Sequence, residues 1–260
     1  MPVSPRKRVR RMPVRMPMRM LALSLVAGAM LAGCSSRQAP LQAAAATPAA
    51  PVQEASVQET PVAARTPADA CPADPGWNDP SPPRHVHGDT WYVGTCGIAS
   101  VLIRGEAGHI LIDSGTERGA ALVLENLRAL GVDPREVRRL LVSHEHMDHA
   151  GGLAALQAAT GAPVLALPRA IPALRSGRNE RSDPQFLDLT PFAPVADVRA
   201  IADGQTVRVG RLAVTAHATP GHTAGGTSWT WRSCEDAGGC VDIAYVDSLT
   251  AIADRSYRFS

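Results

Sequence analysis

The stretch Ser143-His144-Glu145-His146-Met147-Asp148-His149-Ala150-Gly151-Gly152 decides how this chain is interpreted. It directly follows an apolar run, residues 140–142, that predicts a short buried strand. Because side chains alternate along extended backbone, the first two histidines can point to one side, while the aspartate and the third histidine belong to the turn that follows. Imidazole and carboxylate groups are the ligands of zinc in open, catalytic sites. The run therefore predicts a metal centre with room for two ions, and its candidate ligands are His144, His146, Asp148 and His149.

A second histidine motif, Thr219-Pro220-Gly221-His222-Thr223, follows a predicted strand at residues 212–215. A Pro-Gly turn that ends in histidine can carry a metal ligand on a loop. On its own this motif would fit an ordinary turn histidine equally well. Beside the first motif, we expect His222 to be the third ligand of a first metal site formed with His144 and His146.

Strand-like segments occur in hairpin groups on both sides of the first motif. Residues 91–113 alternate like a hairpin, and further strand pairs are expected within residues 206–215 and 228–246. Helices are predicted over about 117–130 and from about 152 to 159. This arrangement favours an α+β fold with two largely antiparallel sheets covered by helices, rather than a strict βαβ series.

Residues 1–33 indicate an export signal. They hold seven Arg and Lys residues and no acidic residue, and the apolar run at 20–30 is short for a membrane span. Residues 31–34, Leu-Ala-Gly-Cys, resemble a bacterial lipobox, in which Cys34 is lipidated and becomes the mature N-terminus. Ordinary signal cleavage nearby is the alternative. We expect a periplasmic protein, with Cys34 as an anchor to the outer membrane.

Residues 34–70 are rich in Ala and Pro and poor in large apolar groups, which predicts a disordered tether. The folded domain is expected over residues 71–260. Without the seven basic residues of the signal, 19 basic residues face 24 acidic ones, so the net charge is −5. No basic stripe is present, and nucleic acid is therefore not expected as a partner.

The predicted domain contains four cysteines: Cys71, Cys96, Cys234 and Cys240. An even number in an exported chain favours disulfides. Cys234 and Cys240 flank a turn-forming stretch at residues 235–239, so a bridge between them would staple a hairpin, and Cys71 would then pair with Cys96. Zinc ligation by cysteine is the alternative, but no C-x-x-C spacing occurs.

The two histidine motifs, residues 143–152 and 219–223, resemble those of the metallo-β-lactamase superfamily. The resemblance covers about residues 75–260. It implies a four-layer αββα sandwich with the metal ions at one edge of the β layers. The H-x-H-x-D-H pattern is specific to this superfamily but not to a substrate, because glyoxalase II enzymes, lactonases and nucleases share it.

The residues around Ser248 narrow the resemblance. Where the first subclass of zinc β-lactamases has a ligand cysteine, this chain has Ser248, within a run (245–251) that is similar to the third subclass of class B. Residues 227–231 and 257–260 and the two expected disulfides also resemble that subclass. By this resemblance, Ser248 and Thr250 would help to hold the carboxylate of the substrate.

The same resemblance places the last ligand of the second metal, a histidine, in a segment beyond Ser260. We therefore expect this chain to be C-terminally truncated, with Asp148 and His149 as the protein ligands of an incomplete second site. Asp247 is a further candidate, because an aspartate near this strand bridges the two metals in glyoxalase-like relatives.

The resemblance thus implies hydrolysis of the β-lactam ring of penicillins, cephalosporins and carbapenems, and with it antibiotic resistance. A hydroxide held by two zinc ions would attack the carbonyl carbon, and Asp148 would orient it. One alternative is a glyoxalase II-like thioesterase or a lactonase of the same fold, although export argues against the cytosolic substrate of the thioesterase. A non-enzymatic alternative is an exported zinc-binding lipoprotein.

Overall fold

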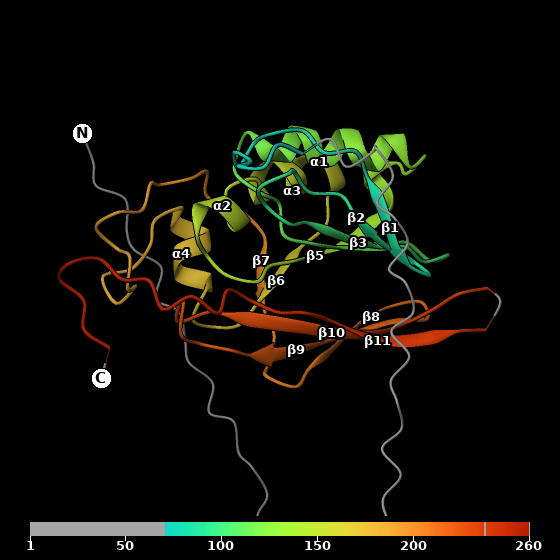
Figure 1. Cartoon of the computed structure of the whole chain (residues 1–260). Coiled ribbons are helices and arrows are strands. Elements are labelled where there is room, and N and C mark those ends of the chain that lie inside the picture. The colour runs from blue at the N-terminus through green and yellow to red at the C-terminus, as the bar shows by residue number, and fades with distance from the viewer. Residues whose placement is uncertain (1–70, 237, 260) are drawn as a thin grey trace, which may run out of the picture. The chain divides into compact units, whose positions relative to one another are not determined.

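The computed structural model describes residues 71–236 and 238–259 (Figure 1). The expected signal peptide, Cys34 and the expected tether lie outside these residues. Within them, no helix is both long enough and apolar enough to cross a membrane.

Sheet A has seven strands that lie side by side in the order of the chain. They are β1 (Arg84–His87), β2 (Thr90–Tyr92), β3 (Val101–Ile103), β4 (His109–Ile112), β5 (Val137–Leu141), β6 (Val164–Ala166) and β7 (Val198–Ala200). Strands β1 to β4 pair antiparallel, whereas β4 to β7 pair parallel. The expectation of largely antiparallel sheets is therefore wrong for this half of sheet A. The connections between these strands cross over the sheet, so each strand begins at the same end of the sheet and runs in the same direction.

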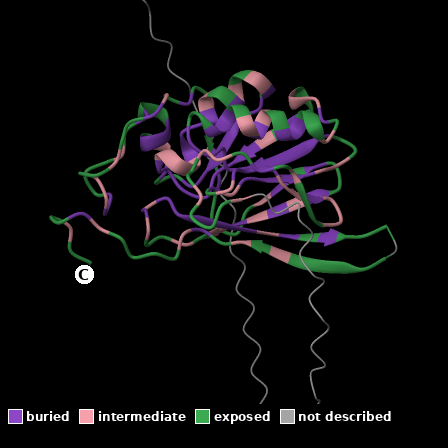
Figure 2. Ribbon diagram, turned by 45° about the horizontal axis from the view of Figure 1, so that its top comes forward, coloured by how far each residue is buried: buried purple, intermediate pink, exposed green. Residues whose placement is uncertain are grey.

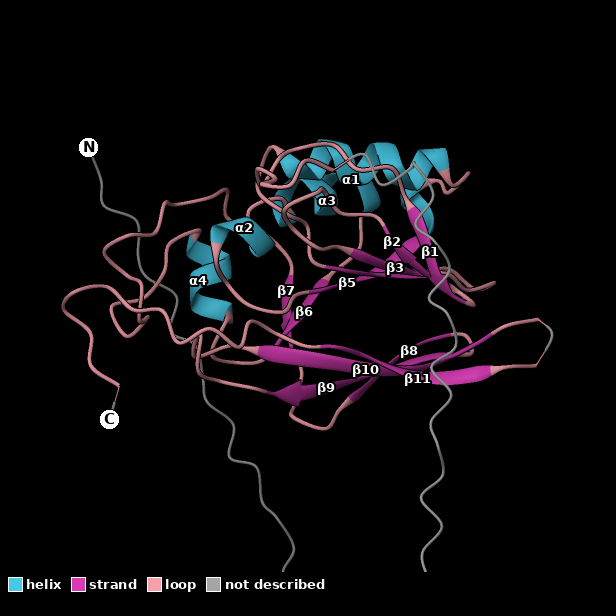
Figure 3. Ribbon diagram, in the orientation of Figure 1, coloured by secondary structure: helices cyan, strands magenta, loops and turns pink. Residues whose placement is uncertain are grey.

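Helices cover one face of sheet A, as Figure 3 shows. They are α1 (Gly119–Ala129), η1 (Pro134–Glu136), α2 (Met147–Ala150), α3 (Leu153–Thr160) and α4 (Ile171–Ser176). Helix α1 begins where Thr116 Oγ1 accepts a hydrogen bond from Gly119 N at 3.0 Å, and its apolar side chains Val123 and Leu127 are fully buried. It ends before Gly131, whose φ of 71° suits a glycine after a helix.

Sheet B has four antiparallel strands in the order β11-β10-β9-β8. They are β8 (Thr206–Val209), β9 (Leu212–Ala218), β10 (Thr227–Cys234) and β11 (Cys240–Tyr245). One face packs on sheet A through Trp229 and Trp231, among apolar side chains of β3, β4 and β5. Trp229 is fully buried and donates from Nε1 to the carbonyl of Val142 at 3.1 Å, so sheet B directly supports the segment that precedes the first histidine motif.

The described residues thus form three layers, which are the helices, sheet A and sheet B (Figures 1 and 2). One core lies between the helices and sheet A and contains Leu111, Leu140 and Leu153; the other lies between the two sheets. Among residues 71–236 and 238–259, no helix covers the outer face of sheet B. These layers correspond to the first three of the expected αββα sandwich.

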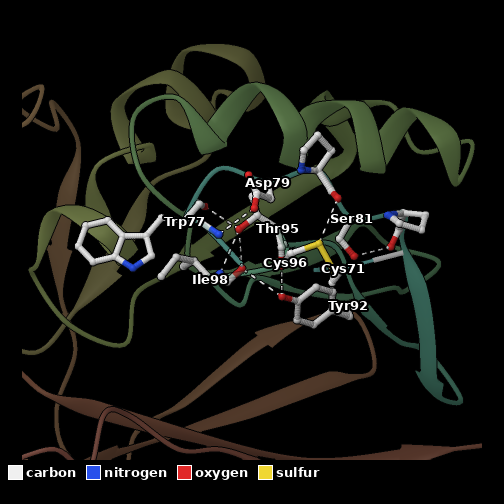
Figure 4. The surroundings of a disulfide bond; sticks show 12 residues. Cys71, Trp77, Asp79, Ser81, Tyr92, Thr95, Cys96 and Ile98 are labelled. Carbon is white, nitrogen blue, oxygen red and sulfur yellow. Dashed lines mark hydrogen bonds between the residues drawn. A yellow bond between two sulfur atoms is a disulfide. The ribbon is translucent and has the colours of Figure 1, made fainter. Parts of the chain in front are cut away.

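Both expected disulfides are present. Cys234 and Cys240 face each other across the β10–β11 hairpin, with 4.0 Å between their Cα atoms. Cys71 is bonded to Cys96, so the start of the domain is tied to the loop after β2. In Figure 4, Trp77 extends away from this second bridge, while its carbonyl accepts a hydrogen bond from Thr95 Oγ1 at 2.8 Å. The bridge therefore helps to fix the backbone that carries Trp77.

Candidate metal centre

The first histidine motif leaves the end of β5 and enters the short helix α2. Its backbone is fixed at Ser143, whose N–H donates to Asp113 Oδ1 at 2.6 Å and whose carbonyl accepts from Thr227 N at 2.7 Å. His144 and His146 follow and are almost completely buried, with exposed fractions of 1% and 2%. The two sheets therefore hold this segment from both sides, at one end of the parallel strands.

The structure brings all five predicted metal ligands together. The possible ligand atoms of His144, His146 and His222 lie within 4.8 Å of one another, and so do those of His144, Asp148 and His149. We call these sets the first and the second metal group. His144 belongs to both, which the sequence analysis did not predict, and its ring centroid lies 4.3 Å from that of His149.

The buried pair His144 and Asp247 shows that the first group fits a metal ion. His144 Nδ1 lies 2.8 Å from Asp247 Oδ1, and burial lowers the pKa of His144 well below its usual range. Its other nitrogen, Nε2, is buried and has no hydrogen-bond partner among the described residues. A buried polar atom without a partner is costly in a protein interior. A metal ion at Nε2 removes that cost.

Asp247 orients a predicted ligand and belongs to neither metal group. Its carboxylate is fully buried, and burial raises the pKa of Asp247 to about 7. The contact is with the outer nitrogen of His144, on the side away from the first metal group. This placement differs from that of a ligand that bridges two metals, which we had considered for Asp247.

Two further carboxylates contact the outer nitrogens of predicted ligands. Asp183 Oδ2 lies 3.0 Å from His146 Nε2, and Asp113 Oδ2 lies 2.8 Å from His149 Nδ1. Histidine ligands in metal sites commonly donate their second N–H to a carboxylate, which fixes the tautomer and the ring orientation. These contacts leave His146 Nδ1 and His149 Nε2 for a metal ion.

Asp113 joins three parts of the site. Besides His149, its carboxylate accepts hydrogen bonds from Ser143 N, Ser143 Oγ and the hydroxyl of Tyr245, at 2.6, 2.7 and 2.7 Å. Burial raises the pKa of Tyr245 well above its usual value, so the hydroxyl stays a donor. Asp113 has a φ of 61°, an uncommon conformation for a residue other than glycine, and such residues concentrate at functional sites.

His222 comes from the loop between β9 and β10 and completes the first group. Its Nδ1 lies 2.9 Å from the carbonyl oxygen of Thr250, which accepts the hydrogen bond and leaves Nε2 for a metal ion. The hydroxyls of Ser248 and Thr250 are 2.8 Å apart. The segment predicted to hold a substrate carboxylate therefore also orients a predicted metal ligand.

A cavity of about 340 Å³ opens over both metal groups. Its further lining residues are Trp77, Met147, Gln185, Asp188, Leu189, Thr190, Ser248, Thr250 and Ile252. Trp77 and Ile252 are about half exposed and place apolar surface at the mouth of the cavity beside exposed polar residues such as Asp188 and Thr190, whereas its floor carries imidazole and carboxylate groups. Such a combination suits a small molecule with an apolar body and a polar reacting group.

Asp113 and Asp183 were missed by the sequence analysis. Asp113 ends the apolar run of β4, and an acidic residue at the end of a strand beside β5 is a signal that could have revealed it. Asp183 lies in an irregular segment without periodicity, and we find no signal for it in the sequence. Its role depends on tertiary structure alone.

Residues 93–236 match the sequence model of the metallo-beta-lactamase superfamily. The chain belongs to this superfamily. A solved structure of MEM-A1, a subclass B3 metallo-β-lactamase from a soil metagenome library, is 49% identical, with a TM-score of 0.69, over 70% of this chain and 69% of that one. MIM-1 from Novosphingobium pentaromativorans is also 49% identical, with a TM-score of 0.70, over 74% of this chain and 70% of that one.

A curated relative matches a smaller part of this superfamily member. The hydroxyacylglutathione hydrolase of Albidiferax ferrireducens is 43% identical over 63 residues, which is 24% of this chain and 22% of that protein. The match therefore spans about a fifth of the relative and concerns a shared segment rather than a whole enzyme.

Proposed function

We propose that this chain is a subclass B3 metallo-β-lactamase that hydrolyses the β-lactam ring of penicillins, cephalosporins and carbapenems. The observation that carries the proposal is the first metal group on the floor of a cavity that Ser248 and Thr250 also line, with a buried His144 Nε2 that has no hydrogen-bond partner among residues 71–236 and 238–259. The similarity to MEM-A1, described as a subclass B3 enzyme, supports the choice of substrate.

We assign zinc to both metal groups. The donors of the first group are three imidazole rings, and those of the second are His144, Asp148 and His149. Imidazole and carboxylate donors with an open position suit catalytic zinc. When bound, zinc supplies a Lewis acid and makes water a nucleophile near neutral pH.

The chain's own residues would then have separate roles in the reaction. Asp148 is partly exposed at the cavity, 3.6 Å from His149 Nε2, and would accept a hydrogen bond from the attacking water and orient it. The hydroxyls of Ser248 and Thr250 would donate hydrogen bonds to the substrate carboxylate. These bonds would place the ring carbonyl over the metal groups. The apolar side chains at the mouth, Trp77 and Ile252, would cover the body of the antibiotic.

A glyoxalase II-like thioesterase or a lactonase is the rival activity, and the partial match to a hydroxyacylglutathione hydrolase favours it. Such an enzyme is expected to use Asp247 as a bridging ligand. The contact of Asp247 with the outer nitrogen of His144 supports the β-lactamase instead. Asp247→Ala separates the two, because removal of a bridging ligand would empty both metal groups, whereas removal of a carboxylate that only orients the shared His144 would weaken zinc binding without abolishing it.

We further propose that the protein is exported to the periplasm, contributes to antibiotic resistance there and is anchored to the outer membrane through lipidated Cys34. The basic and apolar pattern of residues 1–33 supports export, and residues 31–34 support lipidation. Cys34→Ala should release the protein from the membrane fraction. Unchanged membrane association would contradict the anchor.

The test of function is a comparison of substrates. Purified protein loaded with zinc should hydrolyse a penicillin, a cephalosporin and a carbapenem, with loss of the ring absorbance, and should act poorly on S-lactoylglutathione and on a lactone. Faster turnover of the thioester or the lactone would favour the rival enzymes. Bound zinc without turnover of any of these substrates would favour the zinc-binding lipoprotein.

A further inference from the structure

Glu145 stands between two predicted metal ligands, yet its side chain turns away from them. Because side chains alternate along an extended segment, His144 and His146 can face the metal only if the residue between them faces the opposite side. Glu145 is 4% exposed, and burial raises the pKa of its carboxyl. A buried carboxyl group needs hydrogen-bond donors, and what supplies them indicates its role.

The donors come from the loop that carries His222. Thr223 Oγ1 donates to Glu145 Oε2 at 2.9 Å, and Gly225 N donates to Glu145 Oε1 at 3.1 Å. Thr223 is 1% exposed, so its hydroxyl is shielded from water and takes Glu145 as its hydrogen-bond acceptor. Each carboxylate oxygen is thus engaged by a different residue of the loop.

The approach at Gly225 is close enough to require glycine. A Cβ atom on this residue would lie 2.6 Å from Glu145 Oε2 and 2.5 Å from the Cβ of Ala170. Because real Cβ atoms do not come this near to other heavy atoms, a larger residue would push the loop away from Glu145. The loop is therefore shaped to receive this side chain.

Two backbone hydrogen bonds shape the loop from within, and His222 itself contacts the carbonyl of Thr250. Thr219 N donates to the carbonyl of Gly226 at 2.9 Å, which closes its base, and Gly221 N donates to the carbonyl of Thr223 at 3.0 Å, which shapes its tip. Both contacts are internal to the loop. The Glu145 carboxylate, by contrast, joins the tip to the segment that carries His144 and His146.

We propose that Glu145 is a positioning residue that holds the His222 loop against the His144–His146 segment and so sets the metal affinity of the first group. The proposal rests on the proposed function only in so far as that group binds zinc. A carboxylate suits this role better than an amide, because both of its partners are donors. A glutamine offers one acceptor oxygen, and its NH₂ group would face a second donor at Gly225 or the hydroxyl of Thr223.

The test uses zinc alone, without substrate. Glu145→Gln keeps the volume of the side chain and should weaken zinc binding to the first group about 10- to 100-fold, the range typical when an outer partner of a ligand is changed. Affinity is measured by competition with a chromophoric chelator. The d–d spectra of Co²⁺-loaded Glu145→Gln and His222→Ala should both differ from that of the native protein, and in the same direction.

Gln157→Ala is the matched control. The Gln157 side chain also ties two segments together through three hydrogen bonds, to Ala162 and Asp197, but it lies on α3, outside the cavity lining. It should lower stability and leave zinc affinity and the Co²⁺ spectrum unchanged. A loss of affinity equal to that of Glu145→Gln would mean that destabilisation alone weakens the site, and would overturn the proposal.

A double-mutant cycle with His222 decides between positioning and a general structural role. If Glu145 acts through His222, Glu145→Gln should cause no further loss of zinc affinity in a His222→Ala background. An equal loss in both backgrounds, or no loss in the native background, would overturn the proposal. The test is separate from the function test, since zinc binding that depends on Glu145 without β-lactam turnover would contradict only the function.

Discussion

The two metal groups share His144 but differ in where their other members come from. The first group adds His146 and the distant His222, and its rings depend on carboxylates and a carbonyl from other segments for their orientation. The second group adds Asp148 and His149, which lie within the same short motif and have side-chain exposures of 22% and 19%. The first group therefore needs a ligand from a distant loop, whereas the second takes all its members from one motif, where Asp113 from after β4 contacts His149.

The two groups also differ in their affinity for protons. Burial lowers the pKa of His144, and burial lowers that of His222 as well. At His149 burial acts in the same direction but is outweighed by the hydrogen bond with Asp113 and by the charges of Asp113 and Asp148, so its pKa is raised. Protons should therefore compete with metal more strongly at the second group.

Removal of His222 should cause the largest loss of activity, because it takes a ligand from the first group alone. His222→Ala takes a ligand from the first group and should lower kcat/KM for a carbapenem by at least about 1000-fold, more than is typical for outer partners of ligands. His217→Ala is the control, because this nearby histidine pairs with Thr230 in sheet B and does not line the cavity. Activity of His222→Ala within tenfold of the native enzyme would contradict the assignment.

A smaller effect is expected when the orientation of His146 is disturbed. Asp183→Asn replaces the carboxylate that contacts His146 Nε2 with a neutral amide. This should lower the zinc affinity of the first group about 10- to 100-fold, while the second group keeps its affinity. Equilibrium dialysis with metal analysis measures both. Asp197→Asn, at an exposed carboxylate paired with Arg199, should leave both affinities unchanged. Equal weakening of both groups by Asp183→Asn would argue against separate outer contacts.

In the native protein, mild acid should release zinc from the two groups at different pH values. A raised pKa means that the metal-free protein protonates His149 at a higher pH than free histidine does, whereas His144, with its lowered pKa, stays neutral to lower pH. Because a protonated imidazole cannot bind metal, the second group should release zinc first as pH falls from 7 towards 5. Metal content after dialysis at stepped pH values measures this. Earlier release from the first group would contradict it.

The smallest effect on either group is expected from the β10–β11 disulfide. Replacing both Cys234 and Cys240 with alanine should lower the free energy of unfolding by about 2 kcal/mol, because the bridge closes a short loop. Zinc content and turnover should not change. Denaturant unfolding and metal analysis of the same preparation check both parts, and a loss of zinc would show that the hairpin supports the site.

Local pattern was enough to predict the residues that the structure gathers at the metal groups. The spacing within residues 143–152 depends on the alternation of an extended strand end, and the Pro-Gly turn before His222 suits a loop. Helix α1 was also predicted closely, because its apolar periodicity is long enough to be recognised. Such features are carried by neighbouring residues and need no knowledge of the rest of the fold.

What the sequence could not predict depends on contacts between distant segments. The pairing of Asp183 with His146 and the orienting contact of Asp247 arise only when separate loops meet. Glu145 was treated as a spacer between two ligands, since the loop that it binds lies far along the chain. The parallel pairing of β4 to β7 was missed for a related reason, because strands as short as β6 carry too few residues for a clear pattern.

The most direct test of the account is a zinc titration of the metal-free protein in the presence of a carbapenem. Bound zinc is counted while loss of the ring absorbance is followed. The account predicts no turnover without metal, and turnover that rises in step with zinc bound to the first and second groups. Full zinc binding without hydrolysis, or hydrolysis that persists after the metal has been removed by a chelator, would contradict it.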